Sequence, residues 1–101
     1  MRIHFVRTGG FAGMQLVNTI DSEELPEEEV HALESELDNA HFFELPPFLS
    51  RDTGGADRFQ YEITVEDGRK THTVAGGESS LPGNVQPLVQ HLERLARTNR
   101  S

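Results

Sequence analysis

Histidines and carboxylates are the side chains of this chain that are able to ligate a metal or move a proton. The histidines are His4, His31, His41, His72 and His91, and no two of them share the i, i+4 spacing of a helical metal site. A zinc-peptidase helix has the form His-Glu-x-x-His. Residues 27–31 read Glu-Glu-Glu-Val-His instead, which predicts a solvated helix face. We therefore expect neither a bound metal nor a cofactor.

The residues available for nucleophilic catalysis are equally few. The chain has no cysteine, which excludes disulfides, Cys-ligated zinc, iron–sulfur clusters and a thiol nucleophile. Asp57, His72 and either Ser79 or Ser80 have the residue types of a hydrolase triad. No nucleophile motif surrounds the serines, and nothing in the sequence places the three groups together. We expect a protein that is not an enzyme, and a small hydrolase is the third hypothesis.

A glycine-rich segment occupies residues 8–13. It consists of Thr8, Gly9, Gly10, Phe11, Ala12 and Gly13. The segment lacks the Lys-Ser/Thr ending of a phosphate-binding loop and no helical pattern follows it, so a loop between two strands is the better account. Glycines allow unusual backbone angles and close approach by another backbone. Phe11 either packs back under the hairpin or is displayed to a partner.

Charge excludes several classes of partner. The 101 residues carry a formal net charge of −8, which argues against nucleic acid and against an anionic membrane surface. The start has no apolar stretch of signal-peptide length, and no later segment approaches a membrane span, so we expect a cytoplasmic protein. Residues 21–38 are rich in acids and contain no Lys or Arg. This segment is either a solvated helix face or a surface that steers a basic partner.

Hydrophobic periodicity predicts a single domain over residues 1–101 with an α+β fold. Residues 58–66 alternate most clearly, with Phe59, Tyr61, Ile63 and Val65 on one side, as in an antiparallel sheet with one wet face. Asp67-Gly68 predicts a two-residue hairpin turn, and Asn84 is a plausible N-cap of the last helix. Large apolar residues in the irregular stretch 41–57 predict that part of it packs on the core. The elements expected are strands at 2–7, 14–20, 58–66 and 69–75 and helices at 26–40 and 84–97.

The order of these elements is strand, strand, helix, strand, strand, helix (ββαββα). It predicts a four-stranded antiparallel sheet with two helices on one face. Leu25-Pro26 is followed by an apolar helical stripe, and Leu81-Pro82 is followed by a similar one. An internal duplication of a hairpin-plus-helix unit explains this likeness, and so does chance, because leucine at helical spacing is common.

Three segments together resemble the emfourin family, which are small protein inhibitors of thermolysin-like zinc peptidases such as protealysin. The segments are residues 2–13 (RIHFVRTGGFAG), 42–46 (FFELP), and 55–65 (GADRFQYEITV) leading into 69–74 (RKTHTV). Their order and spacing are similar to those of the family over about residues 1–95. The resemblance implies a cytoplasmic bacterial inhibitor that blocks the active-site cleft of a thermolysin-like metallopeptidase. It implies no cofactor for the inhibitor, and we expect a monomer.

The segment at residues 8–13 is our candidate contact with such a peptidase. Thermolysin-like peptidases are similar in preferring a bulky apolar residue after the scissile bond, and a rigid loop presenting Phe11 fits that pocket. Asp57 and Arg58 are secondary candidates; Asp57 or Asp52 would approach the peptidase zinc, although a turn or cap role for Asp57 is the simpler alternative. The competing function is a small acidic adaptor with no peptidase target, which would bind through the acidic helix face instead.

Overall fold

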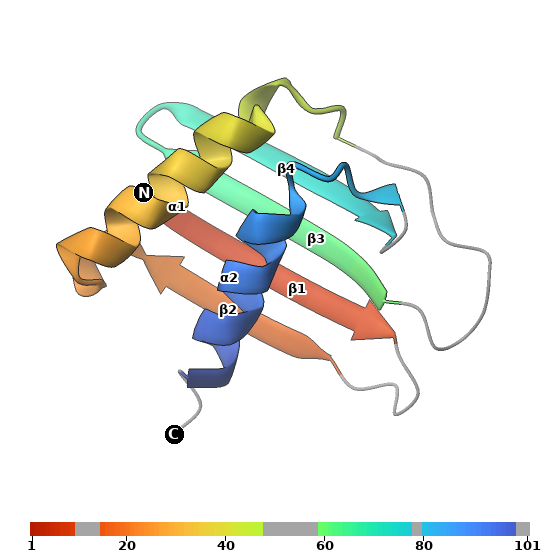
Figure 1. Cartoon of the computed structure of the whole chain (residues 1–101), viewed down its shortest axis with the longest axis horizontal. Helices are drawn as coiled ribbons and strands as arrows, with labels where there is room; N and C mark the ends of the chain where they lie inside the picture. The colour runs from red at the N-terminus through yellow and green to blue at the C-terminus, as the bar shows by residue number, and fades with distance from the viewer. Residues whose placement is uncertain (10–14, 48–58, 78–79, 99–101) are drawn as a thin grey trace.

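One antiparallel sheet organises the chain, as predicted. The computed structural model describes residues 1–9, 15–47, 59–77 and 80–98. Within these ranges the sheet has four strands in the order β2-β1-β3-β4, and both helices cover one of its faces (Figure 1). The α+β class and the ββαββα order are confirmed. The elements are β1 (Arg2–Gly9), β2 (Leu16–Asp21), η1 (Ser22–Glu24), α1 (Glu27–Ala40), η2 (Phe42–Glu44), β3 (Phe59–Asp67), β4 (Lys70–Gly77) and α2 (Gln86–Thr98).

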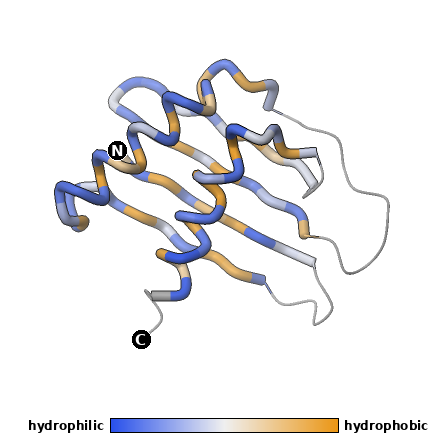
Figure 2. Tube along the Cα trace, in the orientation of Figure 1, coloured by the Kyte–Doolittle hydropathy of each residue, from blue (hydrophilic) through white to orange (hydrophobic). Residues whose placement is uncertain are grey.

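The core lies between the sheet and the two helices. Strands alternate apolar and polar residues along their length (Figure 2), so one side of each strand faces the helices and the other faces solvent. Phe5 in β1 is fully buried, and Ile63 in β3 lies opposite it in the pairing register. The predicted inward positions of β3 are confirmed: Tyr61, Ile63 and Val65 are buried and Phe59 is half-buried.

Helix α1 begins one residue later than the sequence suggested. Pro26 is the N-cap residue rather than the first helical residue, and three glutamates fill the first turn, where the positive end of the helix dipole favours them. Leu33, Leu37 and Ala40 form the buried stripe. The helix ends at His41, whose φ of 50° is left-handed and whose N–H donates to the carbonyl oxygen of Asp38.

The start of helix α2 differs from the prediction that Asn84 is its N-cap. The helix begins at Gln86, so Asn84 lies before the helix and is not its N-cap. The Asn84 side-chain amide instead donates to the carbonyl oxygen of Asn39, 3.0 Å away, and this contact ties the start of α2 to the end of α1. The Asn84 side chain therefore makes a tertiary hydrogen bond, whereas its residue type and position predicted a capping bond within its own helix. The predicted apolar stripe is confirmed, with Val85, Leu88, Leu92 and Ala96 buried and Leu95 half-buried.

The hairpin turn between β3 and β4 is shifted by one residue from the prediction. Asp67 pairs with Lys70, so the two turn residues are Gly68 and Arg69 rather than Asp67 and Gly68. Gly68 has a φ of +63°, a value that suits the first position of the tight turns that join antiparallel strands. The central β1–β3 pairing relates two hairpins antiparallel to each other, an arrangement compatible with the duplication hypothesis.

The segment after α1 packs against β4, as the apolar residues in it predicted. Phe42 is buried, and Phe43 and Leu45 are half-buried. His72 of β4 is half-buried and packs against the rings of Phe42 and Phe43, and its Nε2 lies 2.8 Å from the Leu45 carbonyl oxygen. The N–H of Ala75 donates to the carbonyl oxygen of Pro47. This segment therefore covers part of the outer edge of β4.

A buried histidine joins the two helices. His91 of α2 is 4% exposed. Its Nδ1 lies 2.8 Å from Glu36 Oε1, and its Nε2 lies 2.5 Å from Glu29 Oε2; both glutamates belong to α1. Each ring nitrogen of His91 therefore lies within hydrogen-bond distance of a glutamate carboxyl oxygen. We call Glu29, Glu36 and His91 the helix clamp. The sequence did not reveal it, because the partners are far apart in the chain.

Replacing His91 with Ala is expected to lower the free energy of unfolding by about 2–3 kcal/mol. The change leaves two half-buried carboxylates facing each other without a donor. His31→Ala is the matched control, because His31 also lies beside a glutamate but its side chain is 72% exposed, and exposed pairs contribute little. Urea unfolding followed by circular dichroism measures both. Equal unfolding midpoints for the two variants would show that the helix clamp does not stabilise the fold.

Candidate functional site

Four strand ends meet at one end of the sheet. Gly9 of β1 pairs with Phe59 of β3, and Gly77 of β4 pairs with Gln60. On the other side Leu16 of β2 pairs with Arg7. The end of β1 and the starts of β2 and β3 therefore lie together (Figure 1). The chain between β1 and β2, and the chain that enters β3, both attach here, so both predicted contact segments are connected to the same end. We call it the loop end of the sheet.

The predicted contact residues divide between described and undescribed parts of the chain. Thr8 and Gly9 close β1. Gly10, Phe11, Ala12 and Gly13 lie outside the described residues, and so do Asp57 and Arg58. Whether Phe11 is displayed or packs under the hairpin therefore stays a prediction, as does the role of Asp57.

Gly9 sets the direction in which the chain leaves β1. Its φ is 93°, in a region that only glycine occupies without strain. It is still paired with Phe59 at this point. Any side chain at position 9 would therefore disfavour the backbone conformation at the start of the glycine-rich segment. Gly9 thus uses at the end of β1 the conformational freedom that the sequence analysis ascribed to the glycines of this segment.

A half-buried ion pair braces the loop end. The Arg7 guanidinium donates from Nη1 to Glu93 Oε2 of α2 at 2.5 Å, and the two side chains are 19% and 15% exposed. The Tyr61 hydroxyl donates to the same carboxylate oxygen at 3.4 Å. The guanidinium also stacks over the Phe59 ring, 4.3 Å from its centroid. We call Arg7, Phe59, Tyr61 and Glu93 the loop-end brace; it joins β1, β3 and α2.

Sequence reasoning missed the loop-end brace, but a signal for it exists. Arg7 has the same strand parity as Ile3 and Phe5, so the alternation of β1 directs this charged side chain toward the core. A charge in that position requires a partner. Glu93 interrupts the apolar stripe of α2, next to Leu92. Strand parity therefore flags Arg7, and helical spacing flags Glu93, although only the three-dimensional structure pairs them.

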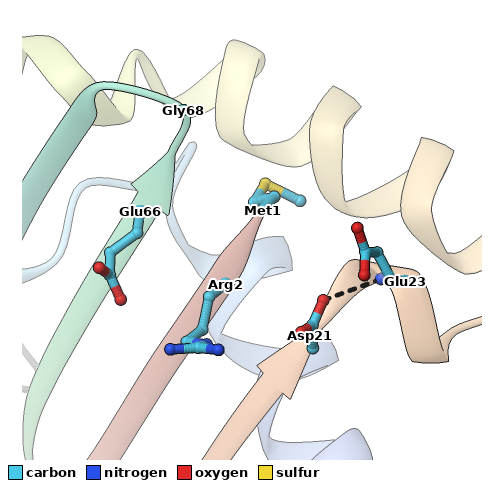
Figure 3. Close-up of a pocket in the computed structure, with 6 residues that line it drawn as sticks. All are labelled: Met1, Arg2, Asp21, Glu23, Glu66 and Gly68. Carbon is cyan, nitrogen blue, oxygen red and sulfur yellow. Dashed lines mark hydrogen bonds between the residues drawn. The ribbon is translucent and has the colours of Figure 1, made fainter.

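The opposite end of the sheet carries a shallow polar hollow (Figure 3). It is lined by Met1, Arg2, Asp21, Glu23, Glu66 and Gly68. Asp21 Oδ1 accepts a hydrogen bond from the Glu23 backbone N–H at 3.0 Å and so caps η1. The carboxylate of Asp21 therefore has a local structural role.

The described ranges contain neither a metal-binding group nor the complete triad that the sequence suggested. Within residues 1–9, 15–47, 59–77 and 80–98, no group of three His, Cys, Asp or Glu residues is able to hold a metal ion. Of the suggested triad, Asp57 and Ser79 lie outside these ranges, and the Nε2 of His72 is engaged by the Leu45 carbonyl. None of the helices in the described part of the chain is long and apolar enough to cross a membrane.

Comparison with known proteins agrees with the sequence resemblance. The family model described as Emfourin matches residues 5–93, a range that includes most of β1, all of β2, β3, β4 and α1, and most of α2. No curated protein matches the chain, and no solved structure matches it. Members of this family are inhibitors, and membership implies that this chain inhibits metallopeptidases. The chain belongs to the emfourin family.

Proposed function

We propose that this protein is a reversible inhibitor of thermolysin-like, protealysin-type zinc peptidases, and that it blocks their active-site cleft with the loop end of the sheet. Family membership supports the inhibitor role, and the convergence of strand ends supports the location. The chain carries its inhibitory surface without a cofactor of its own. A cytoplasmic location and a monomeric state belong to the same proposal.

The loop-end brace is the observation that carries this assignment. A loop that enters a protease cleft binds tightly only if little conformational entropy is lost on binding. Arg7 and Phe59 lie on the two strands from which the candidate contact segments extend. Glu93 ties Arg7 to α2, and Arg7 stacks on Phe59. The strand ends are thereby held in one arrangement before any partner arrives. Phe11 would then present a bulky apolar side chain from a preorganised base.

The second candidate function is that of an acidic adaptor. The helix clamp restricts which glutamates are suitable for charge reversal in a test of this function. Glu36 contacts His91, so reversing its charge would disturb the fold as well as the surface. Glu28 and Glu34 are exposed on α1, and both are suitable for charge reversal. The adaptor hypothesis predicts that Glu28→Lys/Glu34→Lys abolishes partner binding. The cleft-blocking hypothesis predicts only a slower, salt-sensitive association.

The wild-type protein is expected to abolish cleavage of a peptide substrate by a thermolysin-like peptidase at a one-to-one ratio. Phe11→Ala is expected to raise the inhibition constant about 30-fold or more, as removal of a central apolar anchor does. Steady-state assays measure both, and circular dichroism establishes that the variant is folded. Full inhibition by a folded Phe11→Ala would exclude Phe11 as the anchor. No inhibition by the wild type, tested against several such peptidases, would overturn the proposed function.

Glu93→Gln is expected to weaken inhibition about tenfold and to lower the free energy of unfolding by about 2 kcal/mol. The substitution keeps the shape of the side chain but leaves the half-buried charge of Arg7 unpaired. Glu66→Gln is the control, because Glu66 is exposed at the opposite end of the sheet. Inhibition assays and urea unfolding are run on both variants. An inhibition constant for Glu93→Gln equal to that of Glu66→Gln would show that the loop-end brace does not position the contact.

A further inference from the structure

The two edges of the sheet differ in what covers them. At β4, the Ala75 N–H donates to the Pro47 carbonyl oxygen at 3.1 Å, so part of that edge is already paired with the chain itself. At β2, no residue in the described ranges donates to or accepts from the outer backbone groups. Figure 1 shows β2 at the margin of the sheet, with β1 on its inner side. The β2 edge is therefore open.

The register identifies which backbone groups the open edge offers. The Ser22 N–H donates to the Met1 carbonyl oxygen at 2.9 Å. Backbone bonds in an antiparallel ladder alternate from one residue to the next, so the paired positions of β2 toward β1 are Ile20, Asn18 and Leu16. The N–H and C=O groups of Val17, Thr19 and Asp21 point away from the sheet. They form a regular row of donors and acceptors.

The β2 edge also lacks the devices that usually protect a sheet edge. Natural edges are blocked by Lys, Pro, bulges or covering loops. β2 reads Leu-Val-Asn-Thr-Ile-Asp and contains neither Lys nor Pro. Val17 is 50% exposed, and it is the large hydrophobic residue that the described part of the chain leaves exposed. An unprotected backbone row and an exposed valine are thus on the same strand.

We propose that the open edge of β2 pairs with an extended segment of the target metallopeptidase, which adds a strand to the sheet and takes an apolar side chain against Val17. This inference rests on the proposed function and adds a second contact to it. β2 begins at Leu16, which pairs with Arg7 at the loop end, so strand pairing there is continuous with the contact proposed for the loop end. Main-chain hydrogen bonds at a sheet edge supply affinity with little dependence on side-chain sequence.

Charge determines which occupant fits the edge. Asp21 ends β2, and the exposed Glu23 and Glu24 follow it. A segment without excess negative charge, and with a basic residue near Asp21, complements this end. A second copy of this chain fits poorly, because each copy carries a net charge of −8 and β2-to-β2 pairing brings the acidic ends of both copies into one interface. The partner is therefore the peptidase segment rather than a second copy.

Amide hydrogen exchange tests the pairing without any substitution. In the free protein, the amides of Val17 and Thr19 are expected to exchange fast while those of Asn18 and Ile20 are slow. In a complex saturated with peptidase, exchange at Val17 and Thr19 is expected to slow at least about tenfold. Unchanged exchange at both amides in a fully inhibited complex would overturn the inference. Protection already present in the free protein, and lost on dilution, would show that a second copy fills the edge and would also overturn it.

Proline substitution tests the same pairing by function. In Thr19→Pro the lost N–H points outward, so the β1–β2 ladder is kept while a partner strand is blocked. Thr71→Pro is the matched control. The N–H of Thr71, like that of Ala75, points outward from the sheet, but at the β4 edge instead of the β2 edge. Thr19→Val keeps the N–H and removes only the hydroxyl that bonds His4 Nδ1.

The inhibition constant is expected to rise at least about tenfold for Thr19→Pro and to stay within about threefold of wild type for Thr71→Pro and Thr19→Val. Equal inhibition by folded Thr19→Pro and Thr71→Pro would overturn the inference. If Thr19→Pro does not fold, the exchange measurement on the wild type decides. These outcomes differ from failure of the proposed function, in which the wild type does not inhibit at all.

Discussion

Burial on only one face of the sheet is the constraint on which the other features of the structure depend. Both helices pack on the same face, so each strand directs half of its side chains into a single apolar layer. Phe5, Leu33 and Leu88 are completely excluded from solvent in that layer. A polar side chain directed into it has to find a partner there, because water does not reach it.

The polar residues that do enter the layer explain how the elements are held together. His91 lies between two glutamates of α1, Arg7 pairs with Glu93, and His72 reaches the Leu45 carbonyl. Each contact joins elements that are distant in the chain, whereas apolar packing alone allows helices to slide over a sheet. The helix clamp fixes α2 relative to α1, and the loop-end brace fixes α2 relative to β1 and β3. Directional contacts thus set the arrangement that the apolar layer makes stable.

The contrast between local and tertiary contacts explains what the sequence could predict. Period-two alternation in β3 and the leucine stripes of both helices follow from which face is buried, so the fold class and element order were predictable. Asn84 was misassigned to helix capping because its side chain bonds to the backbone carbonyl of Asn39, a residue distant in the chain. The two-residue turn was shifted by one position, since the register decides which two residues remain unpaired. For the candidate site, the glycine-rich segment stays a prediction from the sequence, and the sequence could not pair Arg7 with Glu93.

The edges and faces of the sheet differ in how far the rest of the chain covers them, and this difference bears on where a partner can bind. The β4 edge is partly paired with Pro47, and the helix-bearing face is occupied by α1 and α2. The uncovered sheet face, the loop end and the β2 edge remain. The last two are adjacent because β2 begins at Leu16, which pairs with Arg7 at the loop end. A cleft that binds extended chains presents both an apolar pocket and unpaired backbone groups. In the proposed complex, the loop end and the open β2 edge would complement these two features. Both are already ordered in the folded protein, which lowers the entropy cost of binding.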